Sequence, residues 1–134
     1  MKQPDLLCVY PKQVDEFWPY VEKFLKAATD RCGTWSISDI RREIDKGALL
    51  WIVWDGEAVR AACVTRLIYD PRGLLLEAIA CGGEKQNWRS LYEDIEDYGR
   101  NEGCTISRIS GRPGWMRVFK DYDLAWVTLE KDLR

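Results

Sequence analysis

Hydrophobic residues along the chain follow two spacings, which predict the strands and the helices. Short apolar or alternating runs are typical of strands. Such runs occupy six segments: 6–10, 48–54, 57–69, 74–81, 105–110 and 124–133. In the last run, apolar Ala125, Val127 and Leu129 alternate with the residues between them. That alternation is typical of a strand with one covered face.

Apolar residues spaced by three and four positions predict helices between these runs. Ser36 with Asp39 resembles a capping box, and Asn87 is a suitable N-cap residue. We therefore expect helices in four segments: 11–32, 36–47, 87–103 and 113–121.

The predicted order of elements is β-α-α-β-β-β-α-β-α-β, in one domain over residues 1–134. A hairpin joins antiparallel strands, whereas the helical crossover that follows run 74–81 needs a parallel partner strand. We therefore expect an α/β (α+β) fold with a mixed central sheet of about six strands and helices on both faces. Because run 74–81 is nearly all apolar, it should lie inside the sheet.

Composition narrows the chemistry that this fold can carry. The 134 residues have a formal net charge of −2, which argues against a general nucleic-acid binder. The chain has no His, and its five Cys form no CxxC pair. We therefore predict no metal site and no nucleophile activated by His. No apolar signal core or membrane-length run is present, so we predict a cytoplasmic protein without a membrane partner.

The order of elements and one segment near the end of the chain resemble the GNAT family of N-acetyltransferases. The segment Val118 to Leu124 is similar to the family pattern Leu-Tyr-x-x-x-Gly-Phe, which precedes the last strands. A second stretch, Gly111 to Arg117, resembles GNAT-like proteins of tailed phages. The first resemblance implies the GNAT fold over nearly the whole chain. The second implies a virion or assembly protein, found in the host cytoplasm or in the virion.

In GNAT enzymes, the loop after the fourth strand holds the diphosphate of acetyl-CoA through the pattern Gln/Arg-x-x-Gly-x-Gly/Ala. Its small residues let backbone N–H groups approach the phosphates at a helix N-terminus. Aligned on Leu91, the pattern falls on Gly83, Gln86 and Trp88, and each differs from the family residue. Gly82 with Gly83 offers an alternative cradle one turn earlier. The resemblance thus implies a degenerate acetyl-CoA motif at Ala80, Gly82, Gly83, Gln86, Asn87 and Trp88.

Two residues are candidates for the chemistry of acetyl transfer. Glu77 lies in run 74–81, where some GNAT enzymes carry a Glu that acts as general base through water. Alternatively, Glu77 lies on an exposed strand face or forms an ion pair with an arginine such as Arg66. Phe119 stands where many family members have the Tyr that protonates the departing thiolate. Tyr122 could replace that Tyr only if the helix were shifted, and otherwise it packs.

Basic and aromatic side chains gather late in the chain. Arg112, Trp115 and Arg117 would form a contact surface for a protein partner or a phosphate backbone, and the alternative is a solvated rim. Two hypotheses follow. One is a GNAT-like binding or structural domain without a cofactor, which binds a protein partner or self-assembles. The alternative is an active acetyl-CoA-dependent N-acetyltransferase with Glu77 as general base.

Overall fold

The computed structural model describes residues 4–32 and 34–134, apart from the side chain of Cys32. Five strands form one sheet in the order β1-β2-β3-β4-β5. The first four pair antiparallel, and β5 lies parallel to β4, so the predicted mixed sheet is confirmed. The strand bounds are β1 (Asp5–Cys8), β2 (Leu49–Trp54), β3 (Val59–Asp70), β4 (Gly73–Gly83) and β5 (Ile106–Ile109).

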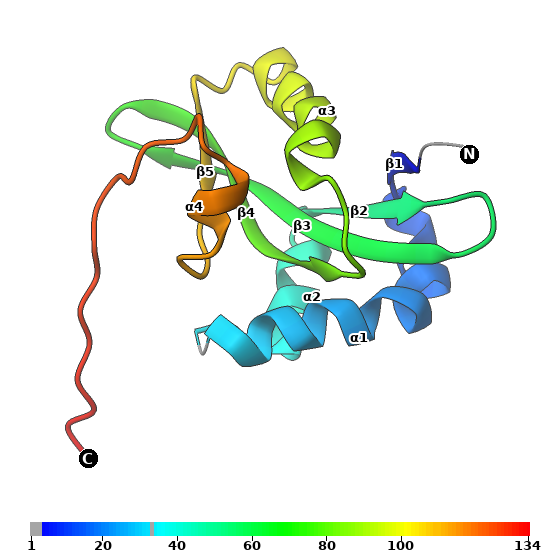
Figure 1. Ribbon diagram of the computed structural model, residues 1–134, viewed down its shortest axis with the longest axis horizontal. Coiled ribbons are helices and arrows are strands. Elements are labelled where there is room, and N and C mark those ends of the chain that lie inside the picture. Colours follow the sequence, from blue (N-terminus) through cyan, green and yellow to red (C-terminus); the bar gives the residue numbers. More distant parts are fainter. Residues whose placement is uncertain (1–3, 33) are drawn as a thin grey trace.

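Helices cover both faces of this sheet, as the sequence predicted (Figure 1). One face carries α1 (Val14–Cys32) and α2 (Ile37–Asp45), with the 3-10 turn η1 (Pro11–Gln13) ahead of α1. The other face carries α3 (Trp88–Asn101) and α4 (Trp115–Val118). The last of these is a single turn, much shorter than the predicted helix over 113–121. No helix in the described ranges is both long and apolar enough to cross a membrane.

The sheet divides the hydrophobic core into two clusters, and β2, β3 and β4 each contribute residues to both. Residues of a regular strand alternate between the two faces. In β4, however, Ala78 belongs to the cluster under α3, whereas both Ile79 and Ala80 belong to the cluster under α1 and α2. A β-bulge explains the change, because Val64 pairs with Ala80 and Thr65 with Ala78, which leaves Ile79 as an extra residue.

The two parallel strands part at this bulge. Their pairing ends at Ala78 and Ile109, and the Ser110 N–H donates to the Ala78 carbonyl at 3.2 Å. From Ile79 onward β4 continues beside β3 as far as Gly83, whereas the chain after β5 turns toward α4. This is the end of β4 at which the resemblance to GNAT enzymes predicts a cofactor site.

The predicted strand over 124–133 is not formed, so the sheet has five strands instead of six. Residues 123–134 have no helix or strand, and they leave the domain on the side of β5 (Figure 1). An alternating pattern predicts which face of a strand is covered, but a strand also needs hydrogen bonds to the backbone of a neighbouring strand. In the part of the chain that the structure describes, no strand pairs with this segment.

Candidate functional site

The predicted cofactor loop is shorter than the sequence indicated, because β4 includes both of its glycines. Gly82 pairs with Ala62 of β3, and Gly83 pairs with Ala61. The Glu84 N–H then donates to the Arg60 carbonyl at 2.9 Å. The prediction that the Gly-Gly pair belongs to the loop is therefore wrong, and residues 85–87 alone link this last bond to α3.

Close packing explains why both positions are glycine. A Cβ atom on Gly82 would lie 2.5 Å from the Phe24 carbonyl oxygen of α1. A Cβ atom on Gly83 would lie 2.4 Å from the Ala61 Cα atom, and the φ of Gly83 is +140°. Neighbouring protein atoms thus occupy the space that a side chain would need at both positions.

The other predicted cofactor residues do not converge on one site. Trp88 is 6% exposed and lies in the cluster beneath α3, whereas Ala80 lies in the cluster on the opposite face. Gln86 is half-buried. Asn87 is exposed and caps α3, with its Oδ1 accepting a hydrogen bond from the Ser90 N–H at 3.3 Å. The position that the family fills with Gly or Ala therefore holds a core tryptophan.

Glu77 is a buried carboxylate held by arginines from both neighbouring strands. Arg66 of β3 donates from Nε to Oε1 at 2.8 Å. Ser110 donates to Oε2 at 3.0 Å, and Nη1 of Arg108 on β5 lies 3.7 Å from the same oxygen. The Glu77 side chain is 8% exposed, so an exposed strand face is wrong and the ion pair with Arg66 is present. Both carboxylate oxygens already accept hydrogen bonds or face a cation.

The contacts of Glu77 extend to α2 and to two aromatic rings. Arg66 also donates from Nη1 to Glu43 Oε1 at 2.6 Å. Its guanidinium lies 5.2 Å from the centre of the Trp35 ring, and that of Arg108 lies 4.6 Å from the Trp126 ring. Stacked rings hold guanidinium groups in place. The set that we call the Glu77 network consists of Glu43, Arg66, Glu77, Arg108 and Ser110.

Phe119, at the position where the family has its acid, also packs in the core. Phe119 is 4% exposed and stacks edge-to-face with Tyr92 at 5.3 Å. The Tyr122 hydroxyl donates to Glu96 Oε2 at 2.5 Å and lies 2.6 Å from Ser107 Oγ. Burial, together with the Glu96 carboxylate, raises the pKa of Tyr122 well above its ordinary value. Tyr122 thus joins α3 to β5.

Arg89 completes a second network that the sequence did not reveal. Helical spacing predicts an ion pair with Glu93, but Arg89 Nη2 instead donates to Glu96 Oε1 at 2.9 Å. Its Nε lies 3.0 Å from Asp121 Oδ1. Glu96 lies two turns further along α3 than Arg89, so the two residues lie on the same face of the helix. No local pattern predicts the contact with Asp121. The set that we call the Tyr122 network consists of Arg89, Glu96, Ser107, Asp121 and Tyr122.

The predicted partner surface is only partly exposed. Arg112 and Arg117 are exposed, but the Trp115 ring lies 5.9 Å from Phe119 and is half-buried. A Cβ atom on Gly111 would lie 2.9 Å from Trp115 Cδ1, so this ring packs closely against the backbone. Two apolar side chains next to Arg117 in the sequence are also exposed, Met116 at 56% and Val118 at 37%.

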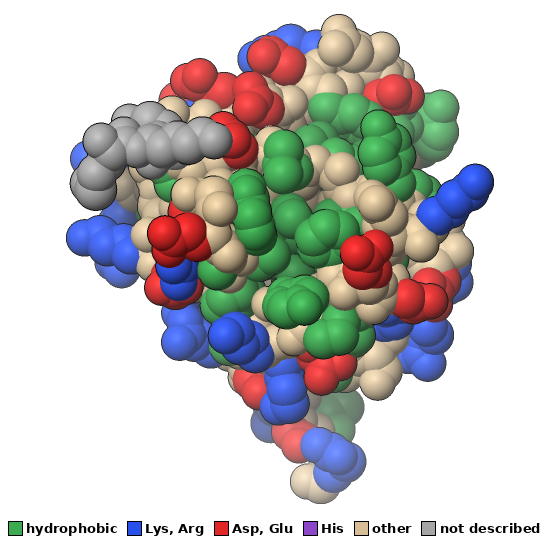
Figure 2. Space-filling model, turned by 90° about the vertical axis from the view of Figure 1, so that its right-hand side faces the viewer, with side chains coloured by type: hydrophobic (Ala, Val, Ile, Leu, Met, Phe, Trp, Pro, Cys, Tyr) green, Lys and Arg blue, Asp and Glu red, His purple; other side chains and the backbone are tan. Residues whose placement is uncertain are grey.

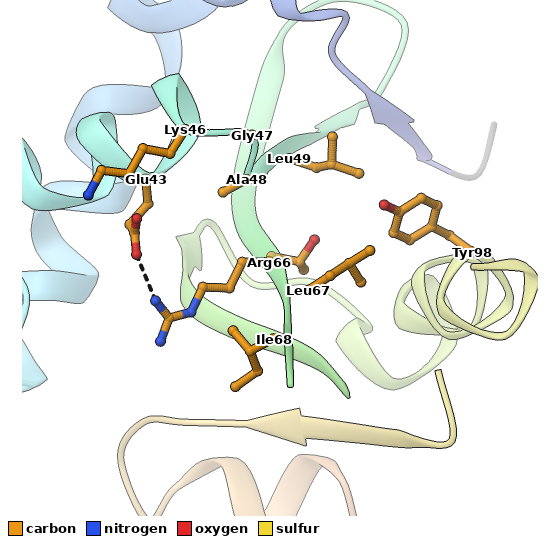
Figure 3. Close-up of a pocket in the computed structure, with 10 residues that line it drawn as sticks. Glu43, Lys46, Gly47, Ala48, Leu49, Arg66, Leu67, Ile68 and Tyr98 are labelled. Carbon is orange, nitrogen blue, oxygen red and sulfur yellow. Dashed lines mark hydrogen bonds and ion pairs between the residues drawn. The ribbon is translucent and has the colours of Figure 1, made fainter. Parts of the chain in front are cut away.

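A pocket of about 290 Å³ lies where β3 runs past the start of β2 (Figure 3). The ion pair of Glu43 with Arg66 forms one wall, and Tyr98 of α3 lies on the opposite side. A smaller cavity of about 100 Å³ lies between α3 and β5. Residues 79–88, which hold the predicted cofactor positions, line neither of the two.

Comparisons with known proteins bear on the fold. No protein-family model and no curated protein matches the sequence. A GNAT family acetyltransferase of Staphylococcus aureus has a TM-score of 0.63 at 10% identity, over 98% of this chain and 99% of that one. An aminoglycoside N-acetyltransferase in complex with CoA has a TM-score of 0.67 at 8% identity, over 100% and 97%.

A third match is a predicted acetyltransferase with acetyl-CoA from Clostridium acetobutylicum. Its TM-score is 0.65 at 12% identity, and 96% of each chain is covered. The matches span nearly the whole of both chains and include the mixed sheet with helices on its two faces. Since a shared fold does not imply a shared activity, the result concerns architecture alone. The chain adopts the GNAT fold.

Proposed function

We propose that this chain is a binding or structural domain that uses the GNAT fold without transferring acetyl groups. The turn from β4 to α3 carries the proposal. The family pattern needs small residues beside open space. In this chain, atoms of α1 and β3 occupy the space beside Gly82 and Gly83, and Trp88 is buried in the core. The residues present therefore do not fit the diphosphate of acetyl-CoA.

The candidate catalytic groups support the same proposal. A general base must have an oxygen that can accept a proton from a substrate or a water molecule. Both oxygens of Glu77 are engaged, by Arg66 on one side and by Ser110 with Arg108 on the other. Phe119 has no proton to donate, and the Tyr122 hydroxyl donates to Glu96. The candidate base, Glu77, and the candidate acid, Tyr122, therefore both take part in contacts that stabilise the fold.

An exposed apolar surface supports a role in binding. Figure 2 shows hydrophobic side chains gathered at the centre of the face that lies to the right in Figure 1, toward β1 and the start of α1. Three large apolar side chains in the first part of the chain, Leu7, Tyr10 and Tyr20, are 45%, 74% and 60% exposed. Contiguous apolar surface of this kind marks sites of protein contact. We propose a protein partner, for which Arg112 and Arg117 offer a second, basic contact.

The resemblance to phage proteins stays a prediction, because none of the three solved structures described above is named as a phage protein. A role in a virion or in its assembly would be one form of the binding function proposed for this chain.

The alternative is an active N-acetyltransferase with Glu77 as general base. One observation favours it: β4 and β5 part at Ile79, at the end of the sheet where the resemblance places acetyl-CoA. This reading requires Trp88 and the β4–α3 turn to rearrange when the cofactor binds.

Titration of acetyl-CoA into the protein separates the two readings. We expect no heat of binding and no rise in melting temperature at about 1 mM acetyl-CoA, because a ligand stabilises only the fold that binds it. The Clostridium acetobutylicum protein, whose structure contains acetyl-CoA, is the positive control. Binding with a Kd of about 1 µM would overturn the proposal and favour the enzyme.

A further inference from the structure

Two cysteines lie directly opposite each other on β3 and β4. Cys63 pairs with Cys81 in the register of the two strands, and both are free thiols. Side chains at opposite positions of an antiparallel pair lie on the same face of the sheet. Both belong to the core cluster beneath α3, and the two thiols share a hydrogen bond. The two sulfur atoms are therefore neighbours within the core.

The backbone geometry at this pair suits a covalent bond between the two side chains. In an antiparallel pair, positions that exchange backbone hydrogen bonds alternate with positions that do not. Arg60 accepts such a bond from Glu84. Cys63 and Cys81 lie three residues from these two, an odd number, so they form a non-hydrogen-bonded pair. The Cα atoms of such a pair are about 4.5 Å apart, within the range that a disulfide spans.

The two cysteines differ in their exposure to solvent. Cys63 is 0% exposed, whereas Cys81 is half-buried. A small reagent from the solvent therefore meets Cys81 first, and Cys63 reacts with the sulfur atom beside it. This is the division of roles in paired redox cysteines, in which one thiol is oxidised and its neighbour resolves the product as a disulfide.

The surroundings of the pair favour a product without charge. Burial and the hydrogen bond with Cys63 raise the pKa of the Cys81 thiol well above its ordinary value. A soft metal ion would need both sulfur atoms as thiolates, and an apolar cluster stabilises charge poorly. A disulfide is neutral and keeps both strands in register. Because few thiolates are present in the folded protein, its formation should be slow.

We propose that Cys63 and Cys81 form a site of reversible oxidation by peroxides, which joins β3 to β4 through a disulfide. The Cys81 thiolate attacks one oxygen of hydrogen peroxide, the O–O bond breaks, and Cys81 becomes a sulfenic acid while the other oxygen leaves as water. The Cys63 sulfur then attacks the Cys81 sulfur, which forms the S–S bond and releases the second oxygen as water. Two thiols are oxidised, and one peroxide molecule is reduced to two water molecules.

This inference goes beyond the proposed binding function and does not depend on it. Peptide mapping of the full-length chain tests it after several hours in about 1 mM hydrogen peroxide and blocking of the remaining thiols. Trypsin cleaves after Arg66 and Arg72, so the two cysteines fall in different peptides. We expect these two peptides to be cross-linked, and dithiothreitol should separate them.

The disulfide should also stabilise the fold, because it closes a loop within one hairpin. We expect the melting temperature of the oxidised protein to rise by roughly 10 °C and to fall again on reduction. Cys63→Ala is the matched control, since it removes the resolving thiol and leaves Cys81 in place. It should give neither the cross-linked peptides nor the rise in melting temperature.

Three results from the native chain would overturn the proposal. They are free thiols at Cys63 and Cys81 after the treatment, oxygen adducts on Cys81 without a cross-link, and a disulfide that joins other cysteines instead. Peptide mapping of the native chain needs no substitution, so the test also decides if Cys63→Ala fails to fold.

Discussion

The Glu77 network and the Tyr122 network lie on opposite faces of the β4–β5 pair and differ in what they hold together. The first is centred on a strand carboxylate and joins three adjacent strands to α2. The second is centred on a helix carboxylate, Glu96, and joins α3 to the segment after α4. Each contains one residue that the sequence suggests as catalytic. In both, that residue's polar atoms are used to fix the fold.

The centres of the two networks are equally shielded from water. Glu77 is 8% exposed and Glu96 is 10% exposed, and Arg66 and Arg89 are each 29% exposed. Removal of one partner from a shielded charge pair leaves a costly unpaired charge, whereas removal of a neutral hydroxyl leaves the charge pair in place. Loss of the Glu77 carboxylate and loss of the Tyr122 hydroxyl should therefore have unequal effects.

The largest effect is expected from Glu77→Ala. It leaves Arg66 and Arg108 partly buried without their shared carboxylate, and should lower the free energy of unfolding by about 4 kcal/mol. Urea denaturation measures this loss. Glu93→Ala, at an exposed position of α3, is the control and should change stability by less than about 0.5 kcal/mol. Similar losses for the two variants would contradict a structural role for Glu77.

Gly82→Ala should be the next most damaging change. Its Cβ would lie 2.5 Å from the Phe24 carbonyl oxygen, so α1 must shift, at a cost of about 2 kcal/mol. Gly114→Ala is the control, because its Cβ would meet nothing closer than 3.5 Å and its φ is −56°. Thermal melts without any ligand decide the matter. If Gly82 serves a cofactor rather than packing, both variants should melt like the native protein.

Much of this fold is predictable from local patterns, and the exceptions have physical causes. Ser36 and Asn87 cap their helices as expected, because capping depends on neighbouring backbone groups. The Gly-Gly pair was misplaced because glycine marks close approach as well as turns, and the close approach here is to α1 and β3. The predicted strand over 124–133 is not formed. Its alternating pattern is local, but a strand also depends on a partner that local sequence does not specify.

The candidate site was less predictable than the fold. The residue type and position of Glu77 are visible in the sequence, and so is Arg66 as one partner. The roles of Arg108 and Ser110 depend on the parallel pairing of β4 with β5, which brings them beside Glu77. The contact of Arg89 with Asp121 depends on where a single helical turn places the chain after it. Residue spacing along the chain does not predict this contact.

A smaller effect is expected from Tyr122→Phe. It removes the hydrogen bond to Glu96 and the contact with Ser107, and should lower stability by about 1.5 kcal/mol. Tyr10→Phe is the control, since Tyr10 is 74% exposed. Chemical denaturation of the two variants compares them directly. An unchanged stability in Tyr122→Phe would show that the network does not hold α3 to β5.

The smallest effect concerns pH and the same hydroxyl. Because the pKa of Tyr122 is raised in the folded state, its contribution is complete below the ordinary tyrosine value of 10 and is lost as the pH rises above it. The advantage of the native protein over Tyr122→Phe should therefore shrink by about 1 kcal/mol near pH 10.5. Denaturation curves at neutral and alkaline pH measure it. A constant advantage would contradict the assignment.

The unequal lengths of the strands have a consequence for the order of folding. β3 and β4 contain 12 and 11 residues and are joined by a tight turn, in which the Arg72 N–H donates to Asp70 Oδ1 at 2.7 Å. Loop closure is fastest for such local contacts, whereas pairing β4 with β5 must wait for the intervening helix. We expect the long hairpin to form early and to set the bulge at Ile79 before β5 arrives. The parting of the parallel strands would then be decided by the first structure to form.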